Sequence, residues 1–276
     1  MILDILKDAL LDTLKLIPFL FIAFLIIELV EHKLKNKEIL KKSGKFGPVI
    51  GSLLGGIPQC GFASLATNLY VTRIISLGTL ISIYLATSDE MLPIMISEQV
   101  ELSFILKIVL VKILIGMTCG VIIDLIYQNK HKESFELCEN EHCHCHDKKY
   151  SLILSSLKHT LNISLFVLIV NILLNAVFTL GLEDLLNKLL LQDSIFGPFI
   201  SSLIGLIPNC GASVIITELY LNEALSLGSL FAGLLTNSGI ALVILFKSNK
   251  NLKENFTILG LIYLIGSIIG LIINLI

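Results

Sequence analysis

One stretch of the chain occurs twice, and this internal repeat constrains the fold more than any other feature of the sequence. Residues 46–88 align with residues 196–238 at a constant shift of 150 without a gap, and 20 of the 43 aligned positions are identical. The identical pairs include glycines, prolines, a cysteine and a tyrosine, which a shared apolar composition alone would not bring into register. We therefore infer an internal duplication in which each copy forms one structural unit.

The composition indicates that these units lie in a membrane. Of the 276 residues, 55% are hydrophobic and only 15% are charged, and a soluble domain of this size could not bury so much apolar surface. Six apolar runs are each about long enough to cross a hydrocarbon core of roughly 30 Å as a helix. They are Leu16–Val30, Ile74–Ile96, Phe104–Ile126, Leu161–Leu180, Ala224–Phe246 and Phe256–Ile276. Because the runs are continuous and rich in Leu and Ile, the sequence predicts an all-α polytopic membrane protein rather than a β-barrel.

The repeated core, residues 46–70 and 196–220, has two interpretations. As one broken helix, each copy would cross the membrane. As two arms of about a dozen residues, each arm would rise about 18 Å and reach roughly the middle of the bilayer. Pro58 cannot continue a hydrogen-bonded helix and Gly61 permits a tight turn, so a re-entrant hairpin is compatible with the first copy.

The charges of the loops favour the hairpin. With a hairpin at residues 46–70, the lysine-rich loops 31–45 and 128–150 are both cytoplasmic, and loop 97–101, which has no Lys or Arg, is outside. A crossing would instead place loop 128–150 outside. The hairpin also leaves three spans in each repeat. An odd number of spans gives the two repeats opposite orientations, which is the inverted-repeat plan of many secondary transporters, here with 8–10 membrane segments.

This organisation divides the chain into three parts. Residues 1–127 form the first membrane repeat, residues 128–150 a cytoplasmic linker rich in His and Cys, and residues 151–276 the second membrane repeat. The expected location is the plasma (inner) membrane, which the chain crosses several times.

The hairpin tips carry polar side chains at equivalent positions. Gln59-Cys60 and Asn209-Cys210 each lie between a proline and a glycine. Backbone broken at membrane depth is tolerated only where it is buried in protein or lines a polar cavity. The structural alternative is that proline and glycine kink two packed helices, with cysteine as a small filler. Since an amide occupies the same place in both copies, we expect these four residues to line a substrate site at the midplane.

Two carboxylates lie inside an apolar span. Asp89 and Glu90 interrupt the run at residues 74–96, and the equivalent part of the second repeat carries Asn237 and Ser238. A carboxylate within a bilayer is costly unless it is paired or hydrated, so it predicts a functional site. The alternative is a structural ion pair between Lys112 and either acid.

The chemistry of these side chains indicates a metal ion as the substrate but does not identify which metal. Carboxylate and amide oxygens suit hard divalent ions such as Mn²⁺, whereas the sulfur atoms of Cys60 and Cys210 favour softer ions. An acid pair that exchanges metal for protons would suit antiport. Glu218, in the second hairpin, is a candidate for the coupling proton.

The linker between the repeats is a second candidate metal site. Six potential ligands lie close together in it: Cys138, His142, Cys143, His144, Cys145 and His146. Such a composition binds metals, but no folded scaffold of a zinc finger surrounds it. We interpret it as an accessory loop that collects or senses metal, with adventitious binding as the alternative.

Two glycine pairs in the third apolar run of each repeat have a structural interpretation. Gly116 and Gly120 in the first repeat align with Gly266 and Gly270 in the second. The spacing is the one that lets membrane helices approach closely, so we expect packing and no chemistry from these positions.

These features resemble the ten-transmembrane heavy-metal exporters, a family also labelled manganese transporters. The resemblance covers nearly the whole chain, and its most specific parts are residues 45–48, 58–62, 87–93 and 205–210 together with the His/Cys loop. It implies metal efflux across a bacterial plasma membrane, with manganese as the leading ion.

The sequence therefore predicts a secondary active transporter that exports a divalent metal cation, with Mn²⁺ favoured, by proton antiport. The expected partners are the metal, protons as the counter-ion and the bilayer; a homodimer is compatible with the sequence, and neither a cofactor nor nucleic acid is expected. A first alternative is a carrier for an anion or a small organic solute, including arsenic species, bound at helix N-termini of the hairpin tips. An enzyme is disfavoured because the chain has no CxxC pair, no His in a core span and no nucleophile–base motif. A passive channel is a further alternative.

Overall fold

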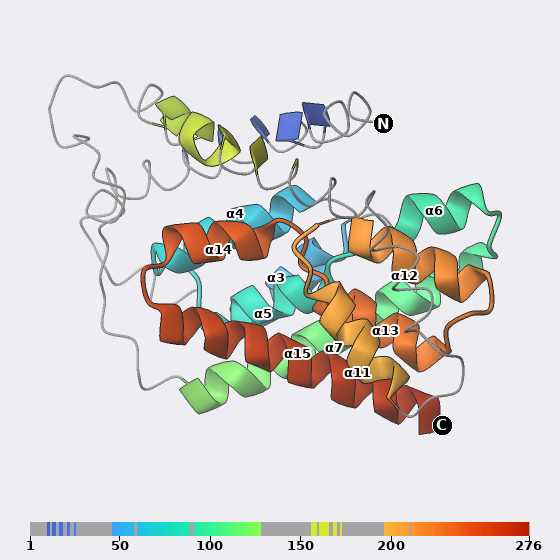
Figure 1. Cartoon of the computed structure of the whole chain (residues 1–276). Helices are drawn as coiled ribbons and strands as arrows, with labels where there is room; N and C mark the ends of the chain where they lie inside the picture. Colours follow the sequence, from blue (N-terminus) through green and yellow to red (C-terminus); the bar gives the residue numbers. More distant parts are fainter. Residues whose placement is uncertain are drawn as a thin grey trace, which may run out of the picture.

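The computed structural model describes residues 46–57, 60–88, 91–127, 196–209 and 211–275, together with isolated positions between 10 and 25 and between 156 and 172. All regular secondary structure among these residues is helical (Figure 1). The first repeat contains α3 (Gly47–Gly55), α4 (Cys60–Val71), α5 (Leu77–Ala86), α6 (Met91–Ser97) and α7 (Leu102–Tyr127). The second contains α11 (Gly197–Gly205), α12 (Gly211–Leu221), α13 (Leu227–Thr236), α14 (Ala241–Ser248) and α15 (Leu252–Leu275).

The duplication in sequence is also a duplication of the fold. Within the first repeat, α5 packs most extensively against α7 and α3; within the second, α13 packs in the same way against α15 and α11. The local signals that start these helices are repeated as well. Ser76 and Ser226 cap α5 and α13, each by accepting a hydrogen bond of 3.2 Å from the main-chain N–H three residues later. Pro48 and Pro198 occupy the first turns of α3 and α11, where a missing N–H costs no helical bond.

The segment α3–α4 folds back on itself. A side chain at Gly47 would collide with Thr79 at the start of α5, and one at Gly55 would meet the carbonyl of Ile83 near its end, so α3 and α5 run parallel. Helix α4 ends at Val71, a few residues before α5 begins. Because the starts of α3 and α5 lie together, the end of α4 lies near the start of α3. The chain therefore returns to the end at which it entered.

A left-handed turn joins this hairpin to α5. The N–H of Arg73 donates to the carbonyl of Tyr70 and the N–H of Ile74 to the carbonyl of Leu69, both at 2.8 Å, with Arg73 at φ 62°. This is the Schellman arrangement that ends a helix. Glu223 occupies the equivalent position of the second repeat, with φ 57°.

The long helices approach their neighbours through glycine. A Cβ at Gly120 would lie 2.6 Å from the carbonyl oxygen of Gly78, and one at Gly270 would lie 2.5 Å from that of Gly228. The predicted role of the glycine pairs in close helix packing is thus confirmed. Since no side chain fits there, α7 and α15 each lie directly against the backbone of the broken helix beside them.

The two repeats meet through equivalent helices. Helix α14 packs on α4, and α6 packs on α12. At one end of the molecule Glu254, at the start of α15, contacts Arg73 after α4. At the other end Phe104, at the start of α7, stacks on Tyr220 of α12, with ring centroids 6.2 Å apart. Helices α7 and α15 therefore run in opposite directions (Figure 1).

The described helices make the chain a polytopic membrane protein, as predicted. Four stretches are long and apolar enough to span a membrane: Leu77–Ser97, Leu102–Tyr127, Leu227–Ser248 and Leu252–Leu275. The first and third were predicted as continuous runs, but each is broken, between α5 and α6 and between α13 and α14. The runs predicted near residues 16–30 and 161–180 lie largely outside the described residues, as does the linker at 128–150.

Candidate functional site

The two broken helices meet at a buried lysine. Lys112, near the middle of α7, is 0% exposed. Its Nζ donates to the carbonyl oxygen of Thr87, which caps the C-terminus of α5, and to that of Leu234 in the last turn of α13, the latter at 3.0 Å. A helix C-terminus carries partial negative charge, so a cation is favoured at both places. We call this meeting point of α5, α13 and Lys112 the junction.

Local side-chain hydrogen bonds accompany the ends of the two helices at the junction. The Thr87 hydroxyl donates to the carbonyl of Ile83 at 2.7 Å, while its backbone turns to ψ 130°. In the second repeat, Asn237 Oδ1 accepts from the N–H of Gly239 at 3.1 Å, and Gly239 adopts φ 55°. The bond from Gly239 to Asn237 is a side-chain turn that replaces the helical pattern, and apolar periodicity carries no sign of it.

Asn209 holds another break, between α11 and α12, in the same way. Its Oδ1 accepts from the N–H of Gly211 at 3.1 Å, and its side chain is buried. Asn209 and Asn237 were both predicted as substrate ligands. The structure gives each a definite local role, the stabilisation of a chain break. An amide oxygen has two lone pairs, so this role leaves Asn237 able to accept a further bond.

Ser238 is the predicted site residue whose surroundings point most directly to a ligand. It is 1% exposed, and its Oγ has no hydrogen-bond partner among the described residues. Leaving a buried hydroxyl without a partner is costly, and a ligand bound beside Ser238 would remove that cost. Its counterpart Ser88 instead donates to the carbonyl of Ala86 at 3.2 Å.

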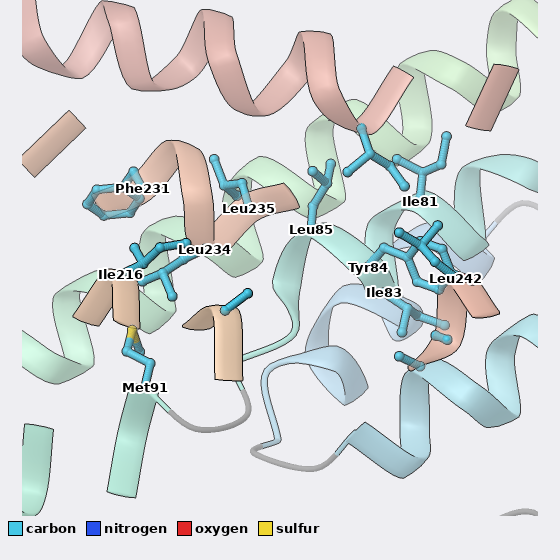
Figure 2. Packing of buried hydrophobic residues seen from close by; sticks show 14 of the residues in the cluster. Ile81, Ile83, Tyr84, Leu85, Met91, Ile216, Phe231, Leu234, Leu235 and Leu242 are labelled. Atoms are coloured by element: carbon cyan, nitrogen blue, oxygen red, sulfur yellow. The ribbon is translucent and has the colours of Figure 1, made fainter. Parts of the chain in front are cut away.

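Apolar side chains surround the junction. Leu85 and Leu235, which are equivalent in the two repeats, point into one buried cluster, which also includes Ile216 and Met91 (Figure 2). This surrounding cluster keeps the local dielectric constant low, and electrostatic interactions with Lys112 are correspondingly strong.

One hydrogen bond ties the hairpin to the broken helix. The hydroxyls of Tyr84 on α5 and Thr67 on α4 lie 2.6 Å apart, and both side chains are fully buried. Thr67 also donates to the carbonyl of Ala63 in its own helix. The first hairpin is thus fixed to the half-helix that ends at the junction.

Several predicted site residues lie outside the described residues. They are Gln59, Asp89, Glu90, Cys210 and the loop residues Cys138, His142, Cys143, His144, Cys145 and His146. Cys60 opens α4, and the structure describes its backbone only. The alternative considered above, an ion pair between Lys112 and Asp89 or Glu90, involves two residues that the structure does not describe.

Glu218, the candidate for proton coupling, differs from the other described site residues. Its side chain is exposed on α12, whereas Asn209, Asn237 and Ser238 are buried. In the part of the chain that the structure describes, no group of three or more His, Cys, Asp or Glu side chains is placed to hold a metal ion.

A polar cluster that sequence reasoning overlooked closes one end of the molecule. Arg73 donates to both carboxylate oxygens of Glu254, at 2.5 and 2.8 Å, and the Tyr70 hydroxyl donates to the same carboxylate. The bond to Glu254 raises the pKa of the Arg73 guanidinium. A signal did exist, because Arg73 is the single arginine of the chain. A single arginine indicates a position of interest, but it does not indicate that its partner is Glu254, 181 positions away.

A cavity of about 260 Å³ lies between the arms of the first hairpin and the start of α5. Its lining is mainly apolar and includes Ile50, Leu54, Phe62 and Leu65. Such a lining offers few ligands to an ion, so this cavity is poorly suited to bind one.

Comparison with known proteins agrees with the resemblance noted in the sequence. A family model described as "Putative, 10TM heavy-metal exporter" matches residues 1–180 and again residues 148–276. No curated protein and no solved structure matches the chain. The two matched segments together span all 276 residues. The chain therefore belongs to the ArsP_2 family of ten-transmembrane heavy-metal exporters.

Proposed function

We propose that this protein is a secondary active transporter that exports a divalent metal cation, with Mn²⁺ favoured, across the plasma membrane in exchange for protons. One observation carries the proposal: two broken helices bring their polar breaks to a buried junction, in a chain of a heavy-metal exporter family. Discontinuous helices near the midplane are the usual binding elements of secondary transporters.

The substrate site combines residues from both repeats. Asn209, Asn237 and Ser238 supply buried oxygen atoms. The sequence adds Gln59, Cys60, Asp89, Glu90 and Cys210 at the equivalent breaks. Carboxylate, amide and hydroxyl oxygens outnumber the two thiols in this set, which favours a hard ion such as Mn²⁺. Glu218 is the proposed proton carrier, and the His/Cys loop the accessory metal-binding segment.

The relation between the repeats suits alternating access. Tyr70 contacts Glu254, and the residues 150 positions away from each, Tyr220 and Phe104, contact one another at the opposite end. Such reciprocal contacts are expected of two units related by a two-fold axis. Together with the antiparallel α7 and α15, they support an inverted repeat whose hairpins re-enter from opposite faces. The lysine-rich loops 31–45 and 128–150 are then cytoplasmic.

The charge of Lys112 favours a second candidate function. A buried ammonium at the junction would attract a negative group, as would the N-termini of α12 and α14. The second candidate is therefore a carrier for an anion or a small organic solute, including arsenic species.

Uptake into inverted membrane vesicles tests the proposal. We expect saturable uptake of Mn²⁺ that depends on an interior-acid pH gradient, with Zn²⁺, Co²⁺ and Fe²⁺ compared in parallel. The double variant Asp89→Asn with Glu90→Gln should abolish it, whereas Glu101→Gln, an exposed acid between α6 and α7, should not. Metal uptake by the double variant at the wild-type rate would refute the site. Transport that is inhibited by oxyanions but not by metals would favour the second candidate.

A further inference from the structure

Lys112 breaks the symmetry of an otherwise duplicated core. Its counterpart 150 positions later is Ile262, and both side chains are 0% exposed. The flanking glycines of α7 and α15 are equivalent, and so are their packing partners on α5 and α13. A buried cation has thus been placed in one repeat at a position where the other repeat carries a plain apolar residue. Since a lysine within a membrane span is costly, a function for this charge is the default expectation.

The groups that bind the ammonium are ones that bind metal ions. Main-chain carbonyl oxygens at half-helix C-termini commonly coordinate hard cations in transporters. Lys112 Nζ occupies two of them, on Thr87 and Leu234. Leu234 lies one helical turn before Asn237 and Ser238, two of the three described ligands of the proposed site. The buried Ser238 hydroxyl, which has no hydrogen-bond partner in the part of the chain that the structure describes, adds a further oxygen close to Leu234 in the sequence.

We propose that Lys112 is a specificity-determining residue that acts as a tethered competitor of the transported metal. Its ammonium and the metal are alternative occupants of the oxygen atoms at the junction. The fixed charge therefore weakens metal binding and speeds metal release, which keeps turnover high. This inference rests on the proposed function, because it presumes a cationic substrate.

Removal of the charge should change binding and turnover in opposite ways. In inverted vesicles we expect Lys112→Met to lower the KM for Mn²⁺ roughly tenfold and to lower the maximal rate as well, since repulsion between like charges is lost. Lys112→Arg keeps the charge and should keep a KM within about twofold of the wild type. Ile262→Met, the matched change in the second repeat, should alter neither value.

A second neutral variant separates the role of charge from that of hydrogen bonding. Lys112→Gln keeps two N–H donors on a side chain that is one bond shorter. We expect it to remain folded even if Lys112→Met does not, and to show the same fall in KM. An unchanged KM in a folded neutral variant would overturn the inference. The inference would also be overturned if both neutral variants failed to fold while Lys112→Arg folded normally. The charge would then be required for the stability of the protein.

The outcomes also separate this inference from the proposed function. If the wild-type protein moves no metal, the proposed function fails. If the wild type moves Mn²⁺ saturably but the KM of the neutral variants is unchanged, only the role of Lys112 fails. A rise in the KM for Mn²⁺ on loss of the charge would overturn the inference as well, because competition with the metal predicts a fall.

Discussion

The guanidinium of Arg73 and the carboxylate of Glu254 form a two-bond pair, 2.5 and 2.8 Å long, that joins the end of α4 in one repeat to the start of α15 in the other. Their side chains are 21% and 17% exposed. At the opposite end, the equivalent elements meet through the stacked rings of Phe104 and Tyr220. The two repeats are therefore joined by an ion pair at one end of the molecule and by an aromatic contact between the equivalent helices at the other end.

Loss of this ion pair should destabilise the protein measurably. Glu254→Gln should lower the free energy of unfolding by about 2 kcal/mol, because Arg73 would remain half-buried without its counter-ion. Thermal unfolding of the detergent-solubilised protein measures the effect, with the exposed Glu101→Gln as the control. The exchanged pair, Arg73→Glu with Glu254→Arg, should recover part of the loss. Glutamate is tolerated at the left-handed position, since Glu223 occupies its equivalent. Identical melting of Glu254→Gln and the wild type would contradict this account.

The N-termini of the broken helices are capped from the long helices, and a carboxylate is not required for this. Asp124 accepts from the N–H of Gly78 at 2.8 Å, and Asn274 accepts from the N–H of Gly228 at the same distance. Asp124→Asn should therefore cost less than about 1 kcal/mol, whereas Asp124→Ala should cost about 1–2 kcal/mol. Asn274→Ala is the matched test in the second repeat. Equal melting temperatures for Asp124→Ala and Asp124→Asn would count against the cap.

Glycine positions on the long helices should differ sharply in their tolerance of alanine. A Cβ at Gly120 would lie 2.6 Å from the carbonyl oxygen of Gly78 and 2.9 Å from Pro48 Cβ, whereas a Cβ at Gly260 would meet nothing within 4 Å. We expect Gly120→Ala to cost about 1–3 kcal/mol. Gly260→Ala should be neutral or stabilising by up to about 1 kcal/mol. The yield and melting temperature of the two variants, purified in parallel, test this expectation. Equal melting temperatures would argue against the close approach of α5 and α7.

The His/Cys loop should tune transport without being required for it. If its six Cys and His residues are all replaced by serine, we expect saturable Mn²⁺ uptake to persist with a raised half-saturation concentration. The reason is that the helices around the junction contain none of these residues. Complete loss of uptake, in a variant that inserts into the membrane at the wild-type level, would show that the loop belongs to the translocation path.

Much of the fold could be predicted because its causes are local. The apolar run at residues 104–126 became α7, and the run at 256–276 corresponds to α15. The glycine spacing correctly predicted close packing. The breaks after α5 and α13 could not be predicted from apolar periodicity, because the apolar runs continue beyond the breaks and a turn such as the one at Asn237 depends on a single side chain. Of the described candidate residues, Asn237 and Ser238 do lie buried at a helix break, but the carbonyl partners of Lys112 were not foreseen.

The membrane class, the duplication and the polar positions at which the repeated core is interrupted could all be predicted from the amino-acid sequence, and the loop charges favoured opposite orientations of the two repeats. These follow from composition and spacing, which act along the chain. The contacts between the repeats became apparent only in the folded chain, in which Arg73 meets Glu254 and Lys112 reaches Leu234 of the other repeat. Those contacts join residues more than 100 positions apart. The energies of these contacts arise when the two repeats dock, because buried charged groups leave water and need new partners. Neither hydrophobic periodicity nor composition specifies which residues become those partners.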